Sequence, residues 1–185
     1  MTVKRHMNAG LILGIDPGSR RMGWALLAAD GVALVRIDGG VLKMASRQAL
    51  PLRLGAIHDH VRALLDQHAI EAMALEAAFV YETARTALVL GQARGVPIGL
   101  AGVNGIDVHE YQPSKVKKHV VGSGRASKHQ VRQMVQMLLE LDEPPPEDEA
   151  DALAVAITHA RVRHLSSLAD PTGARPRVDL DQPPL

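Results

Sequence analysis

The sequence contains no cysteine, and only 2% of its 185 residues are aromatic. The absence of cysteine excludes disulfides, thiol catalysis and cysteine-ligated metal sites, and it fits a reducing compartment. Any bound metal ion must therefore have oxygen or histidine ligands. We find no apolar run long enough to cross a membrane and no apolar segment before the first strand that would act as a secretory signal. We therefore expect no membrane association and a cytoplasmic location.

The charge of the chain is small in total but uneven along its length. The net charge of +1 does not by itself indicate a nucleic-acid binder. Between Tyr111 and Leu139 there are six Lys or Arg residues and no acidic residue, whereas the stretch from Glu140 to Asp151 has seven carboxylates and no Lys or Arg. Two solvated faces would explain this pattern, and so would a phosphate-binding surface beside a cation site.

Hydrophobic periodicity predicts one α/β domain over residues 10–165, with a mixed five-stranded sheet flanked by helices. The predicted strands are 11–16, 22–29, 32–44, 72–76 and 106–111, and the predicted helices are 47–68, 82–95 with a bent continuation past Pro97, one that opens at Pro113, 128–141 and 148–165. We expect residues 1–9 to be a flexible leader. Residues 166–185 contain four prolines and few apolar residues, so we expect a disordered tail.

Four carboxylates are the strongest candidates for chemistry. Asp16 and Glu76 each end an apolar predicted strand, and Asp148 and Asp151 lie three residues apart at the start of the final helix, so that they share one face. If the four converge, their mutual repulsion requires cations, and oxygen-only ligation suits Mg²⁺ or Mn²⁺. Two such ions about 4 Å apart commonly support in-line attack on a phosphodiester. Each residue alone has the simpler interpretation of a cap or turn residue.

Five segments resemble, in order and spacing, the motifs of the RuvC family of Holliday-junction resolvases. They are GIDPGSRRMGW, LEAAF, LGQARG, VKKHVVGSGRASKHQV and DEADALAVAITH, and the match covers about residues 11–160. The resemblance implies an RNase H-like fold, a homodimer, and paired symmetric nicks in a four-way DNA junction that serve recombination and DNA repair. By motif position, the catalytic and metal-binding acids would be Asp16, Glu76, Asp148 and Asp151.

The resemblance also implies a mechanism and partners. Hydrolysis with two metal ions, Mg²⁺ or Mn²⁺, would leave 5′-phosphate and 3′-hydroxyl ends. Asp16 would bridge both ions, Glu76 and Asp151 would complete one site each, and Asp148 would orient a ligand or the attacking water. A branch-migration motor complex is a further partner implied by the resemblance alone.

Several residues around the acids are expected to contact DNA. Phe79, the only phenylalanine, follows Glu76 by three positions. A core position is its ordinary role, but the family has an aromatic here that stacks on junction bases. Lys117 and Lys128 align with family lysines needed for cleavage, and contacts with the DNA backbone are expected from Lys118 and Arg125, with Lys115 and Arg132 as further candidates.

The helix that begins at Lys128 has a predicted capping box, formed by Ser127 and Gln130. The free N–H groups of such a helix start attract phosphate, which favours a DNA contact for Lys128 over an ordinary solvated lysine. His159, by contrast, is expected to be a structural histidine.

Three glycines recur every four residues, at Gly91, Gly95 and Gly99. This spacing indicates close backbone approach, either to the sheet or to a second subunit, and the RuvC family dimerises through this helix. The sequence departs from the family at Ala77, where a Gln is common; this removes one polar contact near the site, and we therefore assign no cleavage-sequence preference to this chain. Glu149 adds a carboxylate that could compete as a metal ligand.

Three alternatives compete with a resolvase. A nuclease of RNA precursors would share the fold, but the lysine-rich segment and the aromatic after Glu76 argue against it. An ATP-binding protein of the actin or sugar-kinase type also begins with a strand that ends in Asp-x-Gly, but this chain is too short for two lobes and lacks glycine-rich phosphate loops. A junction-binding protein without catalysis is the third alternative, and all four acids are present.

Overall fold

The computed structural model describes residues 10–45, 47–77 and 83–169. The secondary structure of these residues comprises, in chain order, β1 (Gly10–Asp16), β2 (Arg21–Asp30), β3 (Ala33–Lys43), α1 (Leu50–Gln67), β4 (Ile70–Glu76), α2 (Ala84–Val103), β5 (Asp107–Tyr111), α3 (Pro113–Val121), α4 (Lys128–Leu138) and α5 (Glu147–Ala169). The predicted mixed five-stranded sheet flanked by helices is confirmed.

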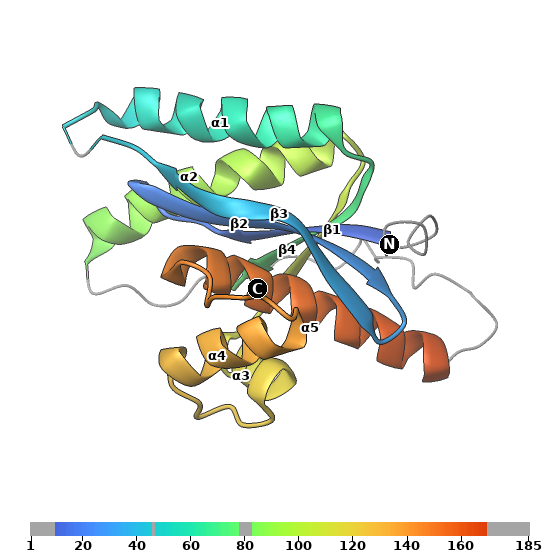
Figure 1. Cartoon of the computed structure of the whole chain (residues 1–185). Helices are drawn as coiled ribbons and strands as arrows, with labels where there is room; N and C mark the ends of the chain where they lie inside the picture. Colours follow the sequence, from blue (N-terminus) through green and yellow to red (C-terminus); the bar gives the residue numbers. More distant parts are fainter. Residues whose placement is uncertain (1–9, 46, 78–82, 170–185) are drawn as a thin grey trace.

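The sheet has the strand order β3-β2-β1-β4-β5, with β1 in the centre (Figure 1). β1 to β3 form an antiparallel meander, because a tight turn at Gly31 with positive φ joins β2 to β3. β4 and β5 are reached through helical crossovers and pair in parallel, β4 with β1 and β5 with β4. The carboxyl ends of β1 and β4 therefore meet at one edge of the sheet.

Helices cover both faces of the sheet, α1 and α2 on one face and α3, α4 and α5 on the other (Figure 1). The alternation of side chains along each strand divides them between two cores. On β1, Leu13 and Ile15 pack toward α1 and α2, whereas Ile12 packs toward α5. On β4, Leu75 belongs to the first core and Ala74 to the second.

Three predicted helix ends differ from the structure. α2 continues as one helix through the buried Pro97 to Val103, because packing of this segment offsets the N–H that proline removes. α4 ends at Leu138. α5 continues to Ala169, so residues 166–169, which we assigned to a disordered tail, are helical. The predicted leader and residues 170–185 lie outside the described residues.

α2 also corrects our expectation that no apolar run is long enough to cross a membrane. Among the described helices, it has the length and composition for a membrane span, and only 17% of its most apolar window is buried. The helix nevertheless packs against α1 and β5, and Arg94 from its middle forms an ion pair with Glu110 of β5. We interpret α2 as a helix with one face on the domain and one open face.

Candidate active site

The sheet brings Asp16 and Glu76 side by side. Asp16 is the last residue of β1 and Glu76 the last of β4, and the parallel register pairs Ile15 with Leu75. Because Ile15 and Leu75 both face α1 and α2, the next residue on each strand faces the opposite side, toward α5. Both carboxylates therefore lie on the α5 face, on neighbouring strands.

Two glycines allow the start of α5 to approach the same edge. Gly14 and Gly23 lie on the α5 face of β1 and β2, and Gly23 pairs with Asp16 in the antiparallel register. A Cβ at Gly23 would overlap the backbone carbonyl of Asp148, and one at Gly14 would overlap the carbonyl of Ala152. The helix backbone thus lies directly on the strands. This contact places Asp148 and Asp151 beside the two strand ends.

The four carboxylates lie close enough for their charges to act on one another. Burial and, in decreasing order of size, the negative charges of Asp151, Glu76 and Asp148 together raise the pKa of Asp16 to about 7. Burial and the charge of Asp151 also raise the pKa of Glu76. The pKa of Asp151 is raised mainly by burial. Such mutual repulsion in a partly buried cluster is typical of a functional site.

Basic side chains compensate part of this negative charge. Lys128 Nζ lies 3.2 Å from Oδ2 of Asp151 and 3.3 Å from Oε1 of Glu147. Burial alone would lower the pKa of Lys128, but these two carboxylates outweigh it and raise the pKa to about 12. Arg21 Nη2 lies 2.5 Å from Oδ2 of Asp148, so this arginine, which follows the first acid closely, binds another acid of the cluster.

A hollow of about 150 Å³ opens beside the cluster, between the end of β4 and helices α3, α4 and α5. Its polar lining consists of Glu76, Asp151, Lys117 and Lys128, and Val116 and Val131 are among its apolar walls. Acids and lysines thus share one concave surface. This arrangement suits a phosphate group with its counter-cations better than a neutral apolar ligand.

The donor set fits Mg²⁺ or Mn²⁺, because every candidate ligand is a carboxylate oxygen. Among the described residues, no group of three or more His, Asp or Glu side chains is arranged to hold a metal ion directly. Asp148 and Asp151 are instead bound by Arg21 and Lys128. These two basic side chains neutralise part of the negative charge of the cluster, and divalent ions would also do so.

The residues expected to contact DNA have different positions. Lys117 and Lys128 both line the hollow beside the acids. Lys118 and Arg125 are exposed on α3 and in the turn after it, outside the lining of the hollow. Phe79 lies outside the described residues.

Two other basic residues of the segment have partners within the chain. Arg132, a further candidate for a DNA contact, donates hydrogen bonds from Nε and Nη2 to the carbonyls of Pro145 and Pro144. Lys115 Nζ lies over the Tyr111 ring, 5.5 Å from its centroid. The predicted capping box of Ser127 and Gln130 is confirmed, with both reciprocal hydrogen bonds present.

Sequence reasoning missed two arginines near the site. Arg94 donates a hydrogen bond to the backbone carbonyl of Glu76, a contact that neither the family resemblance of its motif, LGQARG, nor the glycine spacing predicts. Arg36 binds Glu149 with 2.7 Å between Nε and Oε1, so Glu149 is engaged away from the cluster and is not a competing ligand here. Only the sheet register and the helix packing reveal these partners.

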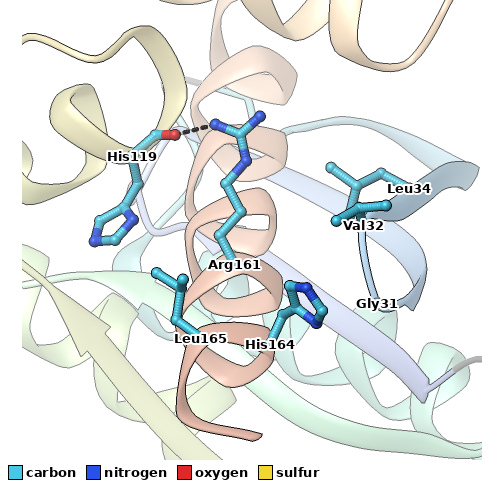
Figure 2. A pocket seen from close by; sticks show the side chains of 7 residues that line it. All are labelled: Gly31, Val32, Leu34, His119, Arg161, His164 and Leu165. Carbon is cyan, nitrogen blue, oxygen red and sulfur yellow. Dashed lines mark hydrogen bonds between the residues drawn. The ribbon is translucent and has the colours of Figure 1, made fainter. Parts of the chain in front are cut away.

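A larger cavity, of about 280 Å³, lies at the other end of α5, beside the β2–β3 turn (Figure 2). Arg161, His119 and His164 line it together with the apolar Val32, Leu34 and Leu165. No carboxylate lines it, and Figure 2 shows the Arg161 guanidinium directed at the His119 carbonyl, which accepts its hydrogen bond. We therefore place the chemistry at the smaller hollow, where the acids converge.

Comparison with known protein families shows to which family this chain belongs. A family model described as crossover junction endodeoxyribonuclease RuvC matches residues 12–159. The chain belongs to the RuvC family. Our expectation of an endodeoxyribonuclease of RuvC type is thereby confirmed.

Individual RuvC proteins agree with this result. The chain is 45% identical over 159 residues to the crossover junction endodeoxyribonuclease RuvC of Geobacter sp. strain M21, which covers 85% of this chain and 96% of that protein. It superposes on Thermus thermophilus RuvC in complex with a Holliday junction substrate with a TM-score of 0.80 and 34% identity, over 85% of this chain and 97% of that one.

A more distant structure supports the fold only. The yeast mitochondrial Holliday junction resolvase Ydc2 superposes with a TM-score of 0.63 at 12% identity, over 85% of this chain and 81% of that one. The RNase H-like fold expected for a RuvC-family chain is therefore confirmed.

Proposed function

We propose that this chain is a structure-selective endonuclease that resolves Holliday junctions by paired symmetric nicks, in recombination and DNA repair. The observation that carries the proposal is the convergence of Asp16, Glu76, Asp148 and Asp151, in a RuvC-family chain, beside a hollow that also contains Lys117 and Lys128. A four-way DNA junction is the substrate named for the Thermus thermophilus relative.

The four acids are the proposed catalytic and metal-binding residues. Mg²⁺ or Mn²⁺, two per site, would lower the pKa of the attacking water and stabilise the leaving 3′ oxygen. Asp16 is the central ligand in this proposal, because it couples to all three other acids. Glu76 and Asp151 would complete one site each, and Asp148 would orient a ligand or the water. The products would carry a 5′-phosphate and a ligatable 3′-hydroxyl.

The basic residues have two proposed tasks. Lys117 and Lys128 line the hollow, so they would contact the scissile phosphate and neutralise part of its charge. Lys118 and Arg125 are exposed beside the hollow and would bind the neighbouring DNA backbone. Phe79 follows the end of β4 by three residues, and its proposed role is to stack on bases at the junction.

A homodimer is the proposed working form, because paired nicks need two sites. The open face of α2 contains Leu88, Gly91, Gly95 and Gly99, all exposed. Among the described residues, and apart from the nearby backbone of α2 itself, nothing lies within 4 Å of a Cβ added at any of these three glycines. The part of the chain that the structure describes therefore gives these glycines no close partner, and a second copy would supply one. Sedimentation of wild type and Gly95→Arg tests this: a dimer that the variant lacks is expected.

A partner complex and a cellular location complete the proposed function. A branch-migration motor complex is proposed as a partner through the RuvC family, and the cytoplasm as the place of action. Pull-down of such a motor by the chain in the presence and absence of a junction would test the first of these proposals.

The deciding experiment is a cleavage assay on a synthetic four-way junction with end labels on all strands. Wild type and Asp16→Asn are compared with and without Mg²⁺ or Mn²⁺. Symmetric, ligatable nicks that require metal and disappear in the variant are expected. Tight junction binding without nicking would identify a binding protein, and equal cleavage of duplex DNA or RNA would identify a general nuclease.

A further inference from the structure

Arg94 is a nearly buried arginine whose charge and hydrogen bonds are directed at the end of β4. Its side chain, in the middle of α2, is 11% exposed. Nη1 donates a hydrogen bond of 2.5 Å to the backbone carbonyl of Glu76. Nη2 lies 2.8 Å from Oε1 of Glu110 as an ion pair, without the geometry of a hydrogen bond. The contact with Glu76 is thus the more specific of the two.

The Glu76 carbonyl is one of two backbone groups that fix the exit of the chain from β4. The other is the N–H of Ala77, which donates to the carbonyl of Tyr111 on β5 with 2.8 Å between nitrogen and oxygen. With both groups held, the peptide plane that follows Glu76 has a fixed orientation. The direction of the Glu76 carboxylate depends on this backbone, because a side chain leaves from its Cα.

Arg94 reaches Glu76 from the other layer of the domain. α2 covers the sheet face opposite α5 (Figure 1), whereas the Glu76 carboxylate lines the hollow between α3, α4 and α5. Arg94 does not line that hollow. It therefore has no direct access to a substrate there, and any effect that it has on chemistry must pass through Glu76.

We propose that Arg94 is a positioning residue for Glu76. Arg94 holds the Glu76 carboxylate in the direction needed for metal binding, so that this direction depends on the placement of α2. This inference rests on the proposed function, since it assumes that Glu76 is a catalytic acid. The same helix has the open glycine face, so the acid is linked to the surface proposed for the second copy.

Positioning and charge predict opposite results for metal binding, which makes the inference testable. Loss of a positive charge near a carboxylate would by itself strengthen the binding of a divalent cation. Loss of a hydrogen bond that orients a ligand would weaken it, and such outer contacts are typically worth about 10–100-fold. Arg94→Gln removes the charge and the tight contact, whereas Arg94→Lys keeps the charge and a single donor.

The experiment measures Mn²⁺ binding to the free protein by calorimetry, and the single-turnover rate on a synthetic four-way junction against metal concentration. For Arg94→Gln we expect about tenfold weaker Mn²⁺ binding, a cleavage rate lower by at least about tenfold, and junction affinity within about threefold of wild type. Arg94→Lys should recover part of both losses. Arg85→Gln, an exposed arginine of the same helix, is the matched control and should match wild type.

Glu110→Gln separates the two contacts of Arg94. Because Glu110 is 47% exposed, we expect its loss to change the cleavage rate by less than about threefold. If Arg94→Gln binds Mn²⁺ as tightly as wild type or more tightly, the positioning role is overturned. The same holds if its losses only follow a lower unfolding midpoint, with the metal dependence unchanged. If Arg94→Gln does not fold, the same measurements are made on Arg94→Lys, and Mn²⁺ binding as tight as in wild type would again overturn the positioning role.

Failure of the proposed function has a different signature. In that case, wild type leaves every junction intact at every metal concentration. The calorimetric comparison of Arg94→Gln with Arg85→Gln would still decide whether Arg94 positions a metal ligand.

Discussion

Glu149 and Arg36 form a partly buried ion pair, with 2.7 Å between Oε1 and Nε, one residue away from the proposed ligand Asp148. The Glu149 side chain is 4% exposed, and the same arginine donates to the carbonyl of Gly39. A Cβ at Gly39 would lie 2.8 Å from Oε1 of Glu149, so the strand has room for this carboxylate only because residue 39 is glycine. Glu149 thus pairs with an arginine inside the fold, whereas its neighbour Asp148 is a proposed metal ligand.

Removal of one partner of this pair is expected to be costly. Arg36→Met would leave Glu149 buried without a counter-charge, which typically costs about 3–5 kcal/mol. Urea unfolding should show this loss. Arg36→Met combined with Glu149→Gln should recover more than half of it, because the uncompensated charge is gone. Equal stability of the single variant and wild type would contradict a partly buried pair.

Gly23→Ala should move the start of α5 away from the sheet. The added methyl group would overlap the carbonyl of Asp148, and backbone cannot yield as a flexible side chain does. We expect a loss of about 1–3 kcal/mol in urea unfolding and loss of cleavage, since Asp148 and Asp151 shift with the helix.

Gly55→Ala is the matched control for Gly23→Ala. Gly55 lies inside α1 with nothing within 4 Å of an added Cβ, so alanine there should stabilise the chain by about 1 kcal/mol. A wild-type cleavage rate in Gly23→Ala would show that the close approach of α5 is not required.

Lys128→Gln should separate catalysis from stability. The Lys128 side chain is 69% exposed, and exposed ion pairs contribute less than about 1 kcal/mol, so the unfolding midpoint should hardly change. Cleavage should fall by at least about tenfold at saturating protein, because Lys128 lines the hollow with Glu76 and Asp151. Lys118→Gln, outside the hollow, should instead weaken junction binding in a salt-dependent manner. The opposite assignment of the two effects would refute this division.

His159 should make the chain less stable in mild acid. Burial, followed by the charges of His109 and Arg163, lowers the pKa of His159 to about 4. In the unfolded chain this histidine takes up its proton near pH 6.5, so between about pH 6.5 and 4 the unfolded state binds more protons. Stability is therefore expected to fall as the pH falls through this window, by at most roughly 3 kcal/mol, with no contribution above it.

Thermal unfolding between pH 8 and pH 4 tests this prediction. His159→Gln removes the titration and can keep a hydrogen bond to Tyr111, whose Oη lies 2.8 Å from Nδ1 of His159. It should lose less stability on acidification than wild type, whereas the exposed His129→Gln should follow wild type. Parallel curves for all three proteins would show that His159 does not cause the acid sensitivity.

The sequence predicted the sheet and the four acids because both depend on local signals. Apolar runs that end in a carboxylate mark β1 and β4, and the spacing of Asp148 and Asp151 is a property of one helix. The capping box at Ser127 is also local, since it spans only residues 127–130. Such signals need no knowledge of the rest of the chain.

The partners of the charged residues were not predictable in the same way. Arg21, Arg36 and Arg94 bind Asp148, Glu149 and Glu76, and the first two pairs span more than a hundred residues of the sequence. Which arginine meets which carboxylate depends on strand register and helix placement. The end of α5 at Ala169 was missed for a related reason, because its last turns have little periodic apolar pattern.

The placement of α5 on Gly14 and Gly23 also determines when the acidic cluster is completed during folding. Asp16 is near the start of the chain, but Asp148 and Asp151 reach it only after the last helix has docked on strands made long before. Parallel pairing of β1 with β4 across α1 adds another distant contact, and contacts of this kind form late in folding. A chain still emerging from the ribosome therefore has no complete acidic cluster. The capacity to cut DNA would be the last property that this chain gains as it folds.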